Sequence, residues 1–467
     1  MSTHLNRPLP ALASAIRDGA LSPVELTAAA IDRHETADPD CGAYKTWAPE
    51  LARKMAEAAE LAVRSGSYLG SLHGIPVSVK DLFAVRSLPT YAGTPKRLPP
   101  EFEREGPVVA ALRRQLGVIT GKTHTVELAF GGLGVNTHWD TPRNPWDAQI
   151  HRVPGGSSSG AGVSLWEGSA LLALGTDTAG SVRSPASMTG TVGLKTSAGR
   201  WSTQGVVPLS PSLDTVGLLA RSVVDLVFAF GALDPCHGDG HRFHLQARQR
   251  HLTGLRIGLG AESMWEHCQD DIVATVNTAL TEIAADGATL VELDMPEAAE
   301  AVDLLRSGSV VAAQCDEFLT SVLPEWRVLA GPLLKLRIDD GASIGARAYL
   351  QRQRSLNRLC TRAVGLFEEV DLIATPTVPI SPPPVDTVLD MEGYREPNIA
   401  ALSNTCVANY LGLCAVTMPV GLDSAGLPVG LQLMAASGQE ELLLGAALAV
   451  ERVLGTARER IGTPPGL

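Results

Sequence analysis

The sequence predicts an α/β fold with a parallel or mixed sheet, and three observations support this prediction. Residues 255–293 alternate strand, helix and strand, with Ile272 and Val276 in an apolar helical stripe between two short apolar runs. Apolar runs at 74–79 and 372–376 have the length of buried strands. The chain also contains 46 glycines and 45% hydrophobic residues, a composition that suits helices packed closely on a sheet.

The N-terminal part of the chain is predicted to be mainly helical. A first helix carries Leu12 and Ile16 on one face and ends at Gly19. A second starts at Ser22, because Pro23 occupies its first position and a glutamate follows the Ser22 cap by three residues. Further helices are expected at 51–63 and 107–116.

The middle and the C-terminal parts mix strands with helices. Residues 155–193 are rich in Gly, Ser, Thr and Ala, but apolar anchors at 163–165 and 171–174 favour tight packing around a site over a flexible linker. Residues 236–251 are polar and are expected to form a surface loop, whereas helices are expected to dominate 300–369. The remaining predicted elements are strands at 415–419 and 429–434 and a closing helix at 440–453.

Charge and cysteine content exclude several classes of protein. The formal net charge is −12 and no basic stripe occurs, which argues against a nucleic-acid or anionic-membrane partner. Residues 1–18 lack the pattern of a secretory signal, and no apolar run approaches the roughly 18 residues of a membrane span. Seven cysteines, an odd number without CxxC spacing, favour reduced thiols and a cytoplasmic location.

Three short motifs carry the reactive side chains. They are GIPVSVKD at 74–81, PGGSSSG at 154–160 and GTDTAGSVR at 175–183. Each places a serine or a lysine beside small residues that let the backbone approach a reacting atom closely. Together they supply a nucleophile, a proton relay, a base and a row of amide donors, which are the parts that a hydrolase needs.

Ser181 is the candidate nucleophile of the third motif. A serine hydroxyl reacts poorly until a base removes its proton. The small residues Thr178, Ala179 and Gly180 allow backbone N–H groups to line up towards a developing oxyanion. Taken alone, the motif would fit a Gly-Ser turn before a helix better, so its meaning depends on the other two motifs.

The serine-rich loop admits a different interpretation. Residues 156–160 match G-x-S-x-G, the nucleophile elbow of α/β-hydrolases. That fold needs a histidine late in the chain, whereas the last histidine here is His267, so this interpretation is weak. A phosphate-binding loop is weaker still, because no Gly-Lys-Ser/Thr follows the glycines.

In the absence of a suitable histidine, Lys80 is the candidate base. A lysine acts as a base near neutral pH only when burial or nearby positive charge lowers its pKa. The apolar run before Lys80 supplies such burial. Alone, a lysine after a strand would be interpreted as a surface residue.

The three motifs in this order resemble those of the amidase signature family, and the resemblance covers residues 22–451. Further matching segments are GKT at 121–123, NP at 144–145, GLK at 193–195 and GLPVGLQ at 426–432. The resemblance implies a single compact α/β domain over 1–467, in which helices flank a large twisted mixed β-sheet. The expected parts are N-terminal helices (about 8–65), a catalytic core (about 70–235) and a helical insertion with closing strands (about 250–455).

The resemblance also implies roles for the motif residues. Ser181 is the expected nucleophile, Ser157 the bridging serine after a cis peptide bond from Gly156, and Lys80 the ultimate base. The expected oxyanion hole is made by the backbone amides of Thr178, Ala179, Gly180 and Ser181.

Further residues receive supporting roles from the same resemblance. Ser158 is expected to support Lys80, and Asp177 and Arg183 are expected to hold the loop. Arg183 is also a candidate for reaching an anionic substrate. Phe130 and Tyr91 are candidates for an apolar wall of the substrate cleft, with core packing as the alternative.

No metal or cofactor is expected. The only cluster that suggests a metal site lies in the polar segment after residue 235, and its spacing fits no standard zinc pattern. Its members are Cys236, His237, His241, His244 and His251.

The expected reaction is hydrolysis of a small-molecule carboxamide to a carboxylate and ammonia or an amine, through an acyl-enzyme. Carbamate, urea-type, aryl anilide or ester substrates, including allophanate-hydrolase-like ones, remain alternatives for the same three residues. A glutaminase subunit of a tRNA-dependent amidotransferase is less favoured, because Gly199-Arg200-Trp201 stands where those proteins carry Tyr-Gly-Arg. A catalytically dead binding protein is disfavoured by the three reactive residues. We expect a homodimer or a monomer.

Overall fold

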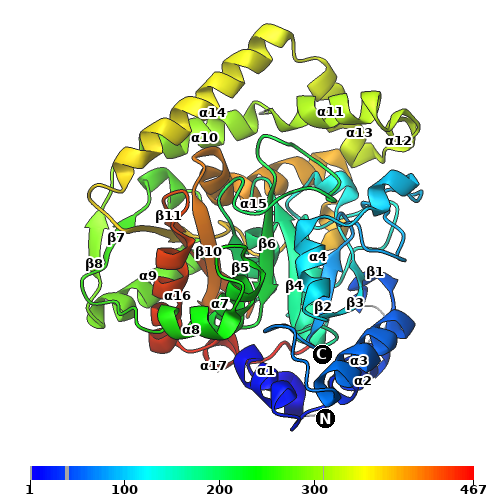
Figure 1. Ribbon diagram of the computed structural model, residues 1–467. Coiled ribbons are helices and arrows are strands. Elements are labelled where there is room, and N and C mark those ends of the chain that lie inside the picture. The colour runs from blue at the N-terminus through cyan, green and yellow to red at the C-terminus, as the bar shows by residue number, and fades with distance from the viewer. Residues whose placement is uncertain (1–2, 37–40, 309) are drawn as a thin grey trace.

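The computed structural model describes residues 3–36, 41–308 and 310–467. These residues form one mixed sheet of eleven strands flanked by helices, as predicted (Figure 1). The strands are β1 (Tyr44–Trp47), β2 (Pro76–Lys80), β3 (Val118–Thr123), β4 (Leu172–Asp177), β5 (Val192–Lys195), β6 (Thr215–Ala220), β7 (Arg256–Leu259), β8 (Thr289–Glu292), β9 (Leu372–Pro376), β10 (Cys414–Leu422) and β11 (Pro428–Ala435). Their order across the sheet is β1-β3-β2-β4-β6-β5-β10-β11-β9-β7-β8.

The helices occupy most of the remaining chain. They are α1 (Leu9–Arg17), α2 (Pro23–Thr36), α3 (Pro49–Arg64), α4 (Pro107–Arg114), α5 (Ala161–Glu167), α6 (Arg183–Met188), α7 (Val223–Leu233), α8 (Gly240–Ala247), α9 (Asp270–Ala285), α10 (Pro296–Arg306), α11 (Val311–Ser321), α12 (Pro324–Leu329), α13 (Pro332–Ala342), α14 (Ala346–Leu366), α15 (Met391–Tyr410), α16 (Glu440–Leu454) and α17 (Ala457–Ile461). Within the described residues, no helix is long and apolar enough to cross a bilayer.

Strand direction places the motif residues. β7 and β8 pair in parallel around α9, as the strand–helix–strand pattern predicts. β2 also pairs in parallel with β4, so the C-terminal ends of these two strands lie at the same edge of the sheet. Lys80 ends β2 and Asp177 ends β4. The first and third motifs therefore meet although about a hundred residues separate them.

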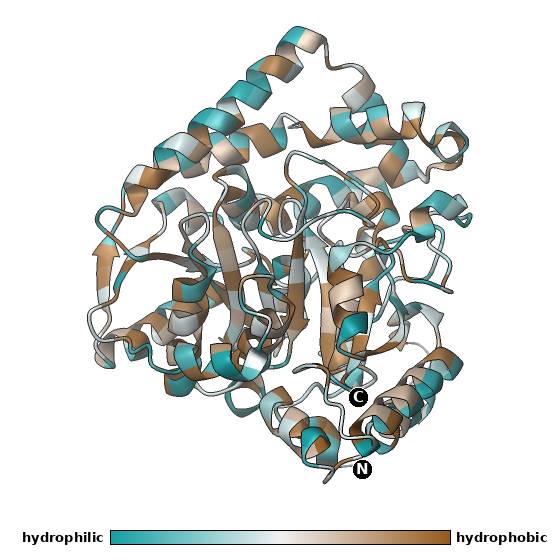
Figure 2. Cartoon of the chain, viewed as in Figure 1, coloured by the Kyte–Doolittle hydropathy of each residue, from teal (hydrophilic) through white to brown (hydrophobic). Residues whose placement is uncertain are grey.

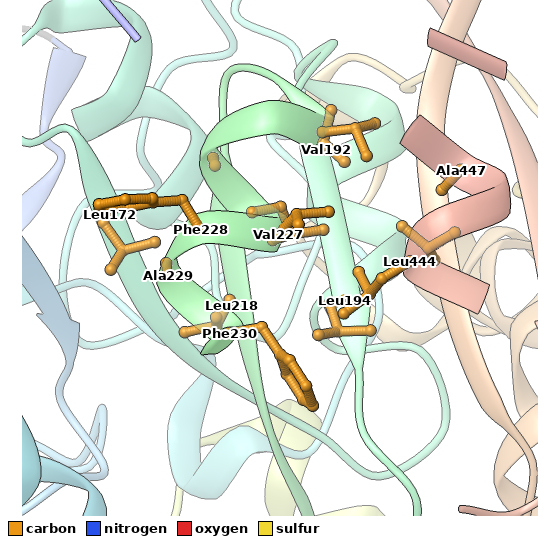
Figure 3. Close-up of a cluster of buried hydrophobic side chains, with 14 of the residues drawn as sticks. Leu172, Val192, Leu194, Leu218, Val227, Phe228, Ala229, Phe230, Leu444 and Ala447 are labelled. Carbon is orange, nitrogen blue, oxygen red and sulfur yellow. The ribbon is translucent and has the colours of Figure 1, made fainter. Parts of the chain in front are cut away.

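The main core lies between the sheet and helices α7 and α16. Figure 3 shows Leu172, Leu194 and Leu218 of the sheet facing these helices, with Phe228 on α7 and Leu444 on α16. All five side chains are fully buried. Burial of a large apolar side chain contributes about 1.5–3 kcal/mol, so this face anchors the strands that carry the motifs.

A second group of helices lies above the upper ends of the strands in Figure 1. It consists of α10 to α14, with α15 nearer the sheet. Figure 2 shows teal bands along α14, in contrast to the brown central strands. α14 buries only Leu356, Leu359 and Ala363 along its 21 residues. This group covers the predicted helical region 300–369 and is more polar than the sheet.

Several helices lie where the sequence did not predict them, and α8 and α15 are two of these. α8 occupies 240–247 inside the segment expected to be a loop, because the Asp239 side chain caps it and Phe243 is buried. α15 was also missed, since Pro397 inside it argues against a helix. It begins where the Asp390 carboxylate accepts a hydrogen bond from the Gly393 amide at 2.9 Å.

Candidate active site

Lys80 lies at the bottom of the site, with no exposed surface. Its Nζ donates hydrogen bonds of 2.8 Å to Ser157 Oγ and of 2.8 Å to Thr176 Oγ1. Burial lowers the pKa of Lys80 to about 7, although the carboxylates of Asp177 and Asp214 act in the opposite direction. Near neutral pH a large share of this amine is therefore unprotonated and able to accept a proton.

The serine-rich loop connects Lys80 to the loop of Ser181. The Gly156–Ser157 peptide bond is cis, as the resemblance implies. The next residue, Ser158, binds the carbonyl of Ser181 through its hydroxyl at 2.6 Å and through its amide at 3.2 Å. Ser158 therefore positions Ser181 and not Lys80, and Thr176 is the additional hydroxyl at the amine.

Asp177 and Arg183 hold the loop of Ser181. Both side chains have no exposed surface, and Arg183 Nη2 lies 2.8 Å from Asp177 Oδ1. The same carboxylate accepts hydrogen bonds from the backbone amides of Gly180 and Val182 at 2.9 and 3.0 Å. Burial raises the pKa of Asp177, but Arg183 outweighs this effect and the pKa falls to about 2. The loop is thus wrapped around a carboxylate that is ionised near neutral pH.

Helix α15 completes this buried network from a distant part of the chain. Arg183 Nη2 also donates to Asn409 Oδ1 at 2.5 Å, and Arg183 Nη1 donates to the Thr405 carbonyl at 2.8 Å. The Thr405 hydroxyl donates to the Ala179 carbonyl at 2.7 Å. With all three guanidinium nitrogens engaged, Arg183 cannot reach a substrate. The prediction that it could is wrong.

The backbone amides before Ser181 differ in availability. The Gly180 amide is bonded to Asp177, so the expected oxyanion donor at Gly180 is already engaged. The hydrogen bonds of the described residues include none from the amides of Thr178, Ala179 or Ser181. These three remain candidates for binding an oxyanion. A Cβ on Gly180, at φ +138°, would lie 2.1 Å from Thr405 Oγ1, so the loop requires glycine there.

Asp214 is a second acid beside the loop, and it is partly buried. Its Oδ1 accepts a 2.6 Å hydrogen bond from the Thr178 hydroxyl, and its Oδ2 accepts the amides of Leu209 and Ser210 at 3.0 Å each. Burial raises the pKa of Asp214 to about 6. Asp214 was not predicted from the sequence, because no motif links it to the loop.

A cavity of about 150 Å³ opens onto Ser181. Its lining includes Thr178 and Ala179 of the loop and also Phe130, a candidate for the wall of a substrate cleft. Much of the opposite wall comes from α10, α11, α13 and α15. The residues of this outer wall are Leu305, Arg306, Gly308, Val311, Ala312, Leu336, Arg337, Asp340, Met391, Arg395, Asn398, Ile399, Leu402 and Tyr410. A larger cavity of about 490 Å³, at Arg7 and Arg221, contains none of the motif residues.

Tyr91 is not among the residues that line the cavity at Ser181, which favours the packing alternative for its side chain. Its ring lies 5.9 Å from that of Trp139, and Lys45 Nζ lies 4.3 Å above it. The same ammonium lies 3.2 Å from the centre of the Trp139 ring. Cation–π attraction and ring packing account for the position of Tyr91.

Similarity to known proteins extends over nearly the whole chain. Residues 25–444 match the family model described as Amidase. The chain belongs to the amidase signature family. A 2-amino-5-chloromuconic acid deaminase of Comamonas testosteroni is 46% identical over 452 residues, which cover 97% of each chain. One subunit of the glutamyl-tRNA(Gln) amidotransferase of Geobacter metallireducens is 32% identical, over 95% of this chain and 96% of its own.

Solved structures of amidases share the fold. A crystal structure described as an amidase superposes with a TM-score of 0.86 at 30% identity, covering 96% of this chain and all of its own. The fold of this amidase signature protein is thus shared with a solved amidase over nearly the whole chain.

The histidine segment of this amidase signature protein packs against aromatic side chains. The His237 ring lies 4.5 Å from that of Phe243, and the His241 ring lies 4.8 Å from that of Phe228. Across the described residues, no group of three or more His, Cys, Asp or Glu side chains could hold a metal ion. The segment is accounted for by packing.

Proposed function

We propose that this protein is a serine hydrolase that cleaves the C–N bond of a small-molecule carboxamide and releases ammonia or an amine. The observation that carries the proposal is the 2.8 Å hydrogen bond from buried Lys80 Nζ to Ser157 Oγ, beside the loop that presents Ser181 to a cavity. A lysine with a pKa of about 7 is matched to proton transfer near neutral pH.

The proposed reaction starts at Ser181. Its Oγ attacks the carbonyl carbon while its proton passes to Ser157, whose own proton passes to neutral Lys80. The amides of Thr178, Ala179 and Ser181 supply hydrogen bonds for the oxyanion. The C–N bond then breaks, and the leaving nitrogen takes the proton back along the same path. Water attacks the acyl-enzyme by the same relay, which releases the carboxylic acid and restores the Ser181 hydroxyl.

A second candidate function is deamination of an unsaturated amino acid. It is favoured by the 46% identity, over 97% of both chains, to a protein named as a 2-amino-5-chloromuconic acid deaminase. Carbamate, anilide and ester cleavage use the same three residues and stay as alternatives. A glutaminase role would require partner proteins, so turnover by the purified chain alone counts against it.

The test is ammonia and amine release by the purified chain on aliphatic amides, anilides, carbamates, glutamine and 2-amino-5-chloromuconic acid. Ser181→Ala is expected to lower kcat by about 10³-fold or more, because the nucleophile is lost. The control is Ser65→Ala, which alters an exposed serine at the C-terminal end of α3, outside the cavity lining. Turnover that survives Ser181→Ala would contradict the proposed nucleophile, and the preferred compound would decide between amide hydrolysis and deamination.

A further inference from the structure

Three arginines line the cavity at Ser181. They are Arg306, Arg337 and Arg395, and Asp340 is the only acidic side chain among the described residues of the same lining. The chain as a whole carries a net charge of −12, so this local excess of positive charge runs against its composition. Guanidinium groups around one small cavity repel one another unless an anion offsets them.

Two of the three guanidinium groups already have partners. Arg337 Nη1 donates to the Phe130 carbonyl, and its guanidinium lies 5.1 Å from the Phe130 ring and 4.7 Å from the Tyr394 ring. These contacts fix Arg337 as part of the wall. Arg306 pairs with Glu396 at 3.7 Å, and both side chains are about half exposed or more, so this ion pair is weak.

Arg395 differs from both. No hydrogen bond, ion pair or ring contact joins it to any of the residues that the structure describes, and it is exposed at the cavity. It lies on α15, the helix whose C-terminal half holds the Ser181 loop through Thr405 and Asn409. A single helix thus connects a free guanidinium to the nucleophile loop. An arginine so placed is suited to bidentate recognition of a carboxylate.

The other residues of the cavity and its volume indicate the size and polarity of the ligand. Leu209, Leu305, Ile399 and Leu402 give it apolar walls. Its volume of about 150 Å³ is below the roughly 300–1,000 Å³ typical of sites for drug-sized ligands. The ligand is therefore short, with an apolar middle between the group that reacts at Ser181 and the group that meets the arginines.

We propose that the substrate carries a carboxylate, and that Arg395 binds this carboxylate with Arg306 as a weaker second contact. The substrate class is then the monoamides of short dicarboxylic acids. For the deamination alternative, it is carboxylic acids of similar size that carry an amino group at the reacting carbon. The inference rests on the proposed function for the reacting end, but the carboxylate site itself can be tested without turnover.

The activity test uses matched pairs of amides. Succinamate, glutaramate and adipamate carry a carboxylate where butanamide, pentanamide and hexanamide have a methyl group. The wild-type protein is expected to prefer the anionic member of at least one pair by about tenfold or more in kcat/KM. Arg395→Gln is expected to lower that preference by about 10- to 100-fold, chiefly through KM, and Arg395→Lys to restore part of it. Arg354→Gln, which removes an exposed arginine of α14, is the matched control for net charge.

The binding test uses Ser181→Ala and the dicarboxylates succinate, glutarate and adipate, measured by calorimetry. We expect one of them to bind, and Arg395→Gln in the same background to weaken its Kd by about tenfold or more. If no amide is hydrolysed but this binding is seen, the proposed reaction fails and the carboxylate site stands. Equal turnover of anionic and neutral amides, or absence of dicarboxylate binding to Ser181→Ala, overturns the inference.

Discussion

Asp177 and Arg183, which hold the Ser181 loop, are fully buried, whereas Arg306 and Arg395 on the facing wall are exposed. Every nitrogen of the Arg183 guanidinium is bonded within the protein. Arg395 has no such bond among the described residues. The bonds of Arg183 hold its side chain in one position, whereas no bond to the described residues holds Arg395 in one. We propose that the fixed region carries the chemistry and that Arg306 and Arg395 of the wall contribute to substrate choice.

The sharpest test of this comparison is Lys80→Met, which removes the amine but keeps an apolar side chain of similar length. We expect kcat to fall by about 10²- to 10⁴-fold, the usual contribution of a general base. Steady-state ammonia release measures it. The control Lys54→Met changes an exposed lysine of α3 and should leave kcat within about twofold. A Lys80→Met enzyme with normal kcat would place the base elsewhere.

Stability should separate the two regions directly. Arg183→Met leaves the Asp177 carboxylate buried without its partner, and such a loss costs about 3–5 kcal/mol in the free energy of unfolding. Arg306→Met breaks only an exposed pair and should cost less than about 1 kcal/mol. Urea unfolding of both variants checks this. Similar costs for both would mean that the loop is no more tightly held than the wall.

The pH dependence of the reaction should reflect the protonation of Lys80 in the fixed region. Lys80 accepts a proton only when neutral, and its pKa is about 7. The rate should therefore fall as the pH drops, by about tenfold between pH 8 and pH 6. Measurements of kcat/KM against pH check this limb, which should be absent from the residual activity of Lys80→Met. A flat profile over this range would contradict a lysine base of this pKa.

The smallest effect is expected at the wall. Leu336 is 45% exposed and lines the cavity, so Leu336→Ala removes little buried apolar surface. We expect kcat/KM to change by less than about fivefold for any one substrate, with the order of preference among amides of different length altered. Kinetics on the three amide pairs measure this change. A loss as large as that of Lys80→Met would contradict the division between the regions.

The buried half of the site could be predicted from sequence because its residues stand in short motifs. Small residues around Ser157 and Ser181 and an apolar strand before Lys80 are local signals. The parallel pairing of β2 with β4, which is a tertiary contact, then brings the first and third motifs together. The partners of Arg183 could not be found in this way, since Asn409 lies more than two hundred residues away. Asp214 was missed for a similar reason, as its role depends on tertiary packing against Thr178.

The wall could be predicted only in part. Phe130 and Tyr91 were both candidates for the wall, and only Phe130 lines the cavity. The sequence could not separate the two, because the position of Tyr91 depends on contacts with Lys45 and Trp139 that no sequence pattern connects. The helix that supplies Arg395 was missed because Pro397 lies within it. Side chains that line a cavity from separate helices have no fixed separation along the sequence. They therefore produce no periodic pattern from which the cavity could be predicted.

The two halves of helix α15 contact different parts of the site. Its C-terminal half, with Thr405 and Asn409, is tied to the loop of Ser181, while Met391, Arg395, Asn398 and Ile399 line the cavity. Asn398 accepts a hydrogen bond from the Gly132 amide, and the Gly132 carbonyl accepts one from the Gly156 amide, so Asn398 also supports the serine-rich loop. We propose that changes at Met391 and Arg395 alter which substrates are accepted, because neither side chain is bonded to Asp177 or Arg183. A library confined to Met391, Arg395 and Ile399 is therefore a proposed route to new substrates, and selection acting on the same positions would let related enzymes diverge while keeping one chemistry.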